Sequence, residues 1–121
     1  MKFLMLKLEP IIWQLFGGGM MLGAFLYPAY LLVIGFTAPL GITPVEELSY
    51  ERVLALASSV PGSVLIAAAI ALPLWAAAHH VRHIFIDFGG LKRDSLVGFV
   101  CYGMAAIGSA LAIVAVLRLH F

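Results

Sequence analysis

Three long stretches without a charged residue constrain this chain more than any other feature of its sequence. They run from Pro10 to Val45, from Gly62 to Ala78 and from Ser95 to Leu117. A membrane-spanning helix needs about 20 consecutive, mostly apolar residues, whereas a helix on the surface of a soluble protein keeps one polar face. We therefore expect an all-α integral membrane protein with three transmembrane helices.

The composition narrows the class of protein further. The 121 residues are 64% hydrophobic and 11% charged, whereas soluble domains carry about 25% charged residues. Because three spans leave little chain outside the bilayer, we expect one membrane domain over residues 1–121, with no catalytic residues and no activity alone. A net charge of +1 without a Lys/Arg cluster indicates no nucleic-acid partner. The single cysteine, Cys101, is expected to be a packing residue.

Proline and glycine set the expected limits of the helices. The spans are predicted over residues 13–38, 61–88 and 95–119. Pro28 and Pro73 fall inside the first two, which membrane helices tolerate when neighbouring helices cover the freed carbonyl. The first apolar run continues past position 40, so we interpret it as a retained span and not as a cleaved signal peptide.

Two further helix starts are indicated between the spans. Thr43-Pro44-Val45-Glu46 has the pattern of a capping box, in which the threonine caps and the glutamate reaches back. It predicts a short helix over residues 44–58, with mixed charged and apolar residues that suit the membrane surface. Asp94 is the expected N-cap of the third span.

The distribution of positive charge predicts the orientation, because cytoplasmic connections carry an excess of Lys and Arg. Five of the seven cationic residues lie in the N-terminal arm and around the second connection, and two lie on the opposite side. The five are Lys2, Lys7, Arg82, Lys92 and Arg93, and the two are Arg52 and Arg118. We therefore expect a multi-pass plasma-membrane protein with a cytoplasmic N-terminus and an external C-terminus.

The residues best suited to chemistry gather at the cytoplasmic end of the second span. His79, His83 and Asp87 are four residues apart and share one helix face. Arg82 lies in the same segment, and Trp13 opens the first span at the same level. An indole, imidazoles and an arginine at the edge of the bilayer suit a quinone, because each ring oxygen needs a donor and quinone redox chemistry also moves protons.

Each of these residues also has a plainer interpretation. Tryptophan and histidine at a membrane interface commonly act as anchors, and Arg82 is also explained as an orienting charge or as the partner of Asp87. A haem b needs two imidazoles, usually from different helices. The other spans contain no histidine, so this chain supplies at most one axial ligand, and neither haem b nor a metal site is expected here.

Small residues indicate close helix packing. Gly19-x-x-x-Gly23 in the first span is a spacing at which helix backbones approach one another. Two interpretations stay open: packing within this chain, or docking to a second membrane subunit.

Several segments together resemble the D subunit of bacterial quinol:fumarate reductases, the smaller of two membrane anchors. They are EPIIWQLFG at residues 9–17, PLG at 39–41, LSYERVLA at 48–55, LPLW at 72–75, then His79, His83, Asp87 and Tyr102-Gly103. The resemblance covers nearly the whole chain from Glu9 onward.

The resemblance implies a four-subunit complex of anaerobic respiration in the bacterial inner membrane. A flavoprotein subunit with FAD reduces fumarate, an iron–sulfur subunit relays electrons, and a second three-span anchor completes the complex. Menaquinol binds at the anchors, near the iron–sulfur subunit. The residues matching Trp13 and His79 belong to that pocket in the family.

One position departs from the family pattern. The family has an arginine directly after the histidine, where this chain has His80, with Arg82 two residues later. Because a helix turns about 100° per residue, Arg82 is expected to point elsewhere and His80 to contribute instead. The full set of expected quinone-binding residues is Trp13, His79, His80, Arg82 and His83.

Two other functions remain open at this point. One is the anchor of a related succinate dehydrogenase, which works in the opposite direction and can contain haem. The other is a small scaffold or transporter subunit without a redox role.

Overall fold

The chain folds into helices joined by short turns. The computed structural model describes residues 2–120 and shows no strand among them. Its α-helices are α1 (Lys2–Leu32), α2 (Tyr50–Ala57), α3 (Val60–Asp87) and α4 (Asp94–Leu117). Three helical segments, Leu6–Thr37, Val60–Asp87 and Asp94–Leu117, are long and apolar enough to cross a membrane. The expected all-α, three-span architecture is confirmed.

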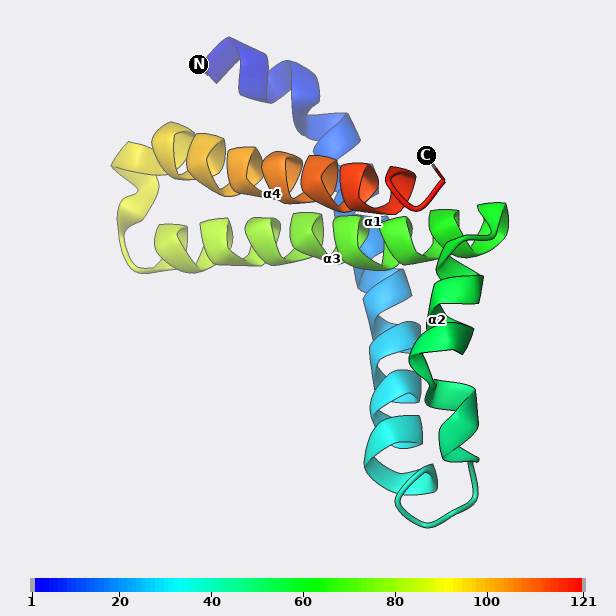
Figure 1. Ribbon diagram of the computed structural model, residues 1–121. Helices are drawn as coiled ribbons and strands as arrows, with labels where there is room; N and C mark the ends of the chain where they lie inside the picture. Colours follow the sequence, from blue (N-terminus) through cyan, green and yellow to red (C-terminus); the bar gives the residue numbers. More distant parts are fainter. Residues whose placement is uncertain (1, 121) are drawn as a thin grey trace.

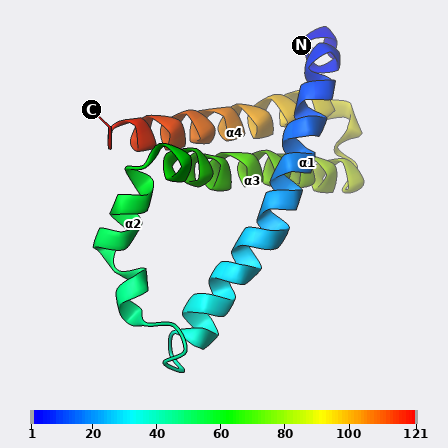
Figure 2. The same cartoon turned by 90° about the vertical axis from the view of Figure 1, so that its right-hand side faces the viewer.

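The helices are arranged around an antiparallel pair. α3 and α4 lie side by side, while α1 crosses them steeply and α2 leads into the start of α3 (Figure 1). Figure 2 shows the same crossing from the side, with the N-terminus nearer than the C-terminus to the α3–α4 turn. The beginning of α1, the end of α3 and the beginning of α4 therefore lie at one end of the molecule.

Gly19 marks a close approach of α1 to α3. A Cβ atom added at Gly19 would overlap the carbonyl oxygen of Leu72 and would lie 3.2 Å from the Cβ of Ala76. Only glycine permits this approach of one backbone to the other. The Gly19-x-x-x-Gly23 spacing thus serves packing within the chain at Gly19, the first of the two interpretations.

Hydrogen bonds also connect the spans where few polar atoms are available. The indole Nε1 of Trp75 on α3 donates to Oγ of Ser109 on α4 at 3.1 Å. The hydroxyl of Ser109 in turn donates to the Ala105 carbonyl at 2.7 Å. The hydroxyl of Tyr27 on α1 donates to the Ala69 carbonyl of α3 at 2.8 Å. These polar atoms thus find partners within the chain, as an apolar interior requires.

The first helix is longer than the sequence predicted. It begins at Lys2 and continues through Pro10, whereas the first span was predicted to begin at residue 13. The first turns run at an angle to the rest of α1 (Figure 1), as expected when a proline removes a backbone hydrogen bond within a helix. At its other end α1 passes into a π-helical turn, Val33–Thr37, closed by a hydrogen bond from Ala38 N to Val33 O.

The predicted surface helix over residues 44–58 is broken into two pieces. A 3₁₀ turn covers Val45–Leu48, and α2 begins only at Tyr50. The expected capping box is wrong: neither helix start has a side-chain cap, and the hydroxyl of Thr43 lies 2.7 Å from that of Thr37. Asp94 does not cap α4 either, because it is the first residue of that helix and binds elsewhere.

Candidate functional site

A cavity of about 180 Å³ opens where the three spans meet at one end of the molecule. It is lined by Leu6, Glu9, Ile12, Trp13, His79, Arg82, Asp94, Ser95 and Tyr102. α1, α3 and α4 all contribute to this wall. Polar side chains are otherwise scarce along these helices, so their concentration here marks the cavity as the candidate site.

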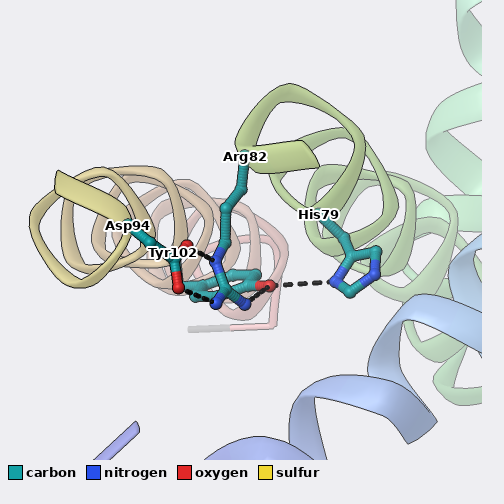
Figure 3. Close-up of polar contacts among 4 residues, drawn as sticks. All are labelled: His79, Arg82, Asp94 and Tyr102. Atoms are coloured by element: carbon teal, nitrogen blue, oxygen red, sulfur yellow. Dashed lines mark hydrogen bonds and ion pairs between the residues drawn. The ribbon is translucent and has the colours of Figure 1, made fainter. Parts of the chain in front are cut away.

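Arg82 and Asp94 form an ion pair across the α3–α4 turn. The Nε and Nη2 atoms of Arg82 each donate to a different carboxylate oxygen of Asp94, both at 2.7 Å (Figure 3). Such two-point pairing is stronger and geometrically stricter than a single contact. It fixes the end of α3 against the beginning of α4.

Tyr102 connects this ion pair to His79. Its hydroxyl oxygen accepts from Nη1 of Arg82 at 3.3 Å and lies 2.9 Å from Nδ1 of His79 (Figure 3). Tyr102 is 5% exposed and His79 is 7% exposed. The Tyr102 ring also stacks on Trp75 at a centroid distance of 6.1 Å. Packing and hydrogen bonds together hold the phenol in one position.

An aromatic wall from α1 faces the histidine. The ring centroids of Trp13 and Phe16 lie 5.0 Å and 4.4 Å from that of His79. The two α1 rings meet edge to face at 5.6 Å. Trp13 remains 52% exposed, and none of the hydrogen bonds among the described residues uses its Nε1. An indole donor and an imidazole therefore stand next to each other at the cavity.

The structure brings only part of the predicted set together. Trp13, His79 and Arg82 line the cavity, whereas His80 and His83 do not. His80 is exposed, and its Nδ1 donates to the Ala76 carbonyl of its own helix at 2.9 Å. The exposed ring of His83 packs against His79 at 4.5 Å, and Asp87 is exposed beyond it.

Arg82 and His80 do point in different directions, but Arg82 and not His80 lies at the cavity. Arg82 follows His79 by three residues, so the two side chains share one helix face. The prediction compared the direction of Arg82 with that of His80, which stands where the family has arginine. The relevant neighbour of Arg82 is instead His79. Arg82 lies in the cavity wall, and His80 lies outside it.

Two residues of the site were missed from the sequence. Tyr102 stands in an uncharged apolar segment, and Asp94 has the position of a helix cap. Their roles depend on how α3 and α4 pack, although one clue was present: a tight turn between antiparallel helices brings residues such as 82 and 94 to the same level.

A second hollow of about 210 Å³ adjoins the first. It is lined almost entirely by apolar groups, from Leu4, Leu8, Ile11, Ile12, Trp75, Phe99, Tyr102, Gly103 and Ala106. Ile12 and Tyr102 belong to both linings. A polar cavity beside an apolar one suits a ligand with a polar head and an apolar tail.

The site contains donors but no cluster of metal ligands. In residues 2–120, no group of three or more His, Cys, Asp or Glu side chains converges on one point. The Arg82 guanidinium uses three nitrogens on Asp94 and Tyr102. The indole of Trp13, the second ring nitrogen of His79 and the side chains of Glu9 and Ser95 are the polar groups of the lining left to meet a ligand.

Comparisons with known proteins match a single family over most of the chain. Residues 5–117 match the family of fumarate reductase D subunits. The fumarate reductase D subunit of Vibrio cholerae is 45% identical over 108 residues, which cover 88% of this chain and 81% of the relative. The protein of the same name from Vibrio vulnificus is 42% identical over 113 residues, covering 92% and 88%. That from Actinobacillus pleuropneumoniae is 35% identical over 112 residues, covering 92% and 91%.

Proposed function

The chain belongs to the family of fumarate reductase D subunits, which are membrane anchors, and from this we propose that it anchors a quinol:fumarate reductase and helps to form its menaquinol site. In this proposal the catalytic centres lie in partner subunits: a flavoprotein with FAD and an iron–sulfur protein. Menaquinol gives up two electrons and two protons, and fumarate takes up two of each to become succinate.

The observation that carries the proposal is the meeting of Trp13 and His79 at a cavity bounded by all three spans. A quinol ring is flat and has oxygens at opposite edges. The indole ring of Trp13 provides a flat apolar surface at the cavity, and Trp13 Nε1 and His79 provide hydrogen-bonding groups for one oxygen. The adjoining apolar hollow suits the isoprenoid tail.

The proposal assigns no haem to this chain. The histidines near the cavity are His79, His80 and His83, and all three lie on α3. Two axial imidazoles must face each other across a porphyrin, which three residues within five positions of one helix do not provide.

The orientation follows from charge together with shape. The N-terminal end of α1 and the α3–α4 turn lie toward the same end of the molecule (Figures 1 and 2). Lys7, in the first turns of α1, and Lys92 and Arg93, in the α3–α4 turn, therefore lie toward that end. By the positive-inside rule this end faces the cytoplasm, which is where the iron–sulfur and flavoprotein subunits would dock.

Large apolar side chains remain exposed along every span. Phe25, Met104 and Leu111 are 74%, 69% and 65% exposed. Single exposed apolar residues are normal, but a continuous apolar surface of this extent must be covered by lipid or by another apolar protein surface. We assign them to lipid and to a second three-span anchor subunit.

Two substitutions test the quinol site in the assembled complex. Trp13→Ala removes an indole donor and part of the flat wall, and His79→Ala removes the imidazole. If each loses one hydrogen bond to a ring oxygen that gains charge, the quinol-dependent rate falls about ten- to a hundred-fold. Fumarate reduction by a soluble artificial donor stays nearly unchanged, because those electrons bypass the membrane.

His120→Ala is the matched control, since His120 lies beside Ser63 at the other end of α3. It should leave both activities near the wild-type level. Unchanged quinol activity in Trp13→Ala and His79→Ala would remove the proposed site, and equal losses with both donors would mean that the complex had come apart.

A further inference from the structure

Arg82 and Asp94 have a role that the quinol site itself does not explain. We propose that the Arg82–Asp94 ion pair acts through Tyr102 to keep His79 protonated on Nε2, so that His79 presents an N–H donor to the ligand. The inference rests on the proposed function, because the ligand oxygen that His79 meets belongs to the quinol site. It assigns Arg82 and Asp94 as positioning residues that do not touch the ligand.

The first step concerns the direction of each hydrogen bond around Tyr102. The guanidinium of Arg82 carries only donors, so its contact at 3.3 Å makes the phenol oxygen an acceptor. The proton of the hydroxyl then needs an acceptor of its own. Among the described residues, the only other partner of this hydroxyl is His79 Nδ1, at 2.9 Å.

Burial makes this requirement strict. Tyr102 is 5% exposed, and a buried hydroxyl proton without an acceptor is costly. No buried side-chain nitrogen or oxygen of the described residues lacks a partner. Tyr102 therefore donates to His79 Nδ1, which must be unprotonated, and the proton of a neutral His79 ring resides on Nε2.

The second step concerns where Nε2 lies. In Figure 3 the far side of the His79 ring points away from Tyr102 and Arg82. None of the hydrogen bonds among the described residues uses Nε2, and because no buried atom among them is left without a partner, Nε2 is accessible. His79 lines the cavity beside Trp13. The Nε2–H group and the Trp13 Nε1–H group are thus two donors placed side by side.

Asp94 fixes the direction of the hydrogen bond from Arg82 to the Tyr102 hydroxyl. Its two oxygens hold Nε and Nη2 of Arg82, which leaves Nη1 directed at the phenol (Figure 3). Without Arg82 the phenol oxygen could accept from a protonated Nδ1 while its own proton turned away. Nε2 would then be an acceptor and would lose its hydrogen bond to a ligand oxygen.

A double-mutant cycle in the assembled complex separates this role from simple structural support. Arg82→Leu should lower quinol-dependent turnover about two- to ten-fold, less than His79→Ala does, because the imidazole stays in the cavity and only its preferred tautomer is lost. In the Tyr102→Phe background the same change should have no further effect, because Arg82 acts through the hydroxyl. A merely structural Arg82 would cause the same loss in both backgrounds, and that result overturns the proposal.

Two amide replacements of His79 test which nitrogen serves the ligand. The side-chain amide of Gln reaches about as far as Nε2, whereas that of Asn reaches only about as far as Nδ1. His79→Gln should therefore retain more quinol activity than His79→Asn. The reverse order would contradict an Nε2–H donor.

The tautomer itself can be measured without relying on any of the Arg82 variants. In ¹⁵N spectra of the histidine-labelled complex, the His79 signals are those that His79→Gln removes. We expect a protonated Nε2 and an unprotonated Nδ1 in the wild type. A protonated Nδ1 on a neutral ring overturns the proposal even if every Arg82 variant fails to assemble.

The controls distinguish this inference from the function beneath it. Arg52→Leu breaks the other Arg–carboxylate pair among the described residues, between exposed Arg52 and Glu47, and should leave quinol turnover unchanged. Loss of quinol activity in His79→Ala but not in Arg82→Leu would reject the positioning role alone. No loss in His79→Ala would reject the quinol site itself.

Discussion

The hydroxyl of Tyr102 lies 2.9 Å from Nδ1 of His79, and this contact joins two membrane helices across 23 positions of the chain. Both side chains are largely buried, so this contact ties two interior residues to each other. The contact shows that the packing of α3 against α4 and the chemistry of the cavity are parts of the same arrangement.

Gly19→Ala should destabilise the crossing of α1 over α3. The added methyl group would overlap the Leu72 carbonyl, which is backbone and cannot turn aside. Overpacking of this kind costs about 1–3 kcal/mol. Thermal inactivation of the purified complex measures the loss. Gly17→Ala is the control, since a Cβ there meets no atom within 4 Å; equal stability of the two variants would contradict the crossing.

Ser109→Ala should leave the indole of Trp75 without an acceptor between α3 and α4. The hydrogen bond of 3.1 Å is lost, at a cost of about 0.5–2 kcal/mol in an apolar setting. The same substitution in a Trp75→Phe background should cost less, because no donor is left unpaired there. Thermal unfolding of the four variants gives the coupling, and strict additivity would argue against this bond.

Gly103→Leu should weaken binding of quinols with long tails. Gly103 lines the apolar hollow, and a Cβ added there meets nothing within 4 Å, so the new side chain can occupy the hollow. Each displaced methylene is worth about 0.8 kcal/mol, which gives a rise in KM of about three- to ten-fold or more.

The matching measurement is steady-state kinetics with two donors. KM should rise for menaquinol and stay unchanged for a naphthoquinol without a tail. Gly17→Leu, at an equally open position outside the hollow, should change neither value. Equal rises in KM for both donors would mean that the substitution disturbs binding of the quinol ring and not of the tail.

The orientation predicts the behaviour of reporter fusions. Five of seven Lys and Arg residues lie on the N-terminal side, so a fusion after the third span should be active only for a reporter that folds outside the cytoplasm. A fusion in the α3–α4 turn, after Gly89, should show the opposite pattern. A C-terminal reporter active only in the cytoplasm would reverse the topology and move the cavity to the external side.

The three spans could be predicted because an uncharged apolar run of this length has few stable structures other than a membrane-spanning helix. Their limits were less predictable. The first span was predicted to begin at residue 13, yet α1 begins at Lys2 and passes through Pro10, because a proline inside a helix removes one hydrogen bond without forcing an end. Thr43 was expected to cap a helix, but its hydroxyl pairs with Thr37, a contact that depends on how α1 ends.

The cavity was predictable only on its α1 and α3 sides. Trp13 and His79 carry side chains that stand out in apolar segments, and the resemblance to a known family supported them. Tyr102 also belongs to the segments that resemble the family, but neither it nor Asp94 gave any indication of its partners, because these are fixed by the α3–α4 turn. The error over Arg82 has the same origin: a helical wheel gives direction within α3, and the neighbouring helix decides what that direction meets.

The most direct test of the menaquinol site is an experimental structure of the whole complex with a quinone bound. We predict that a ring oxygen lies within hydrogen-bonding distance of Trp13 Nε1 or His79 Nε2, with the tail leaving along the hollow that contains Gly103. A quinone bound to the complex with its ring in contact with neither Trp13 nor His79 would contradict the site.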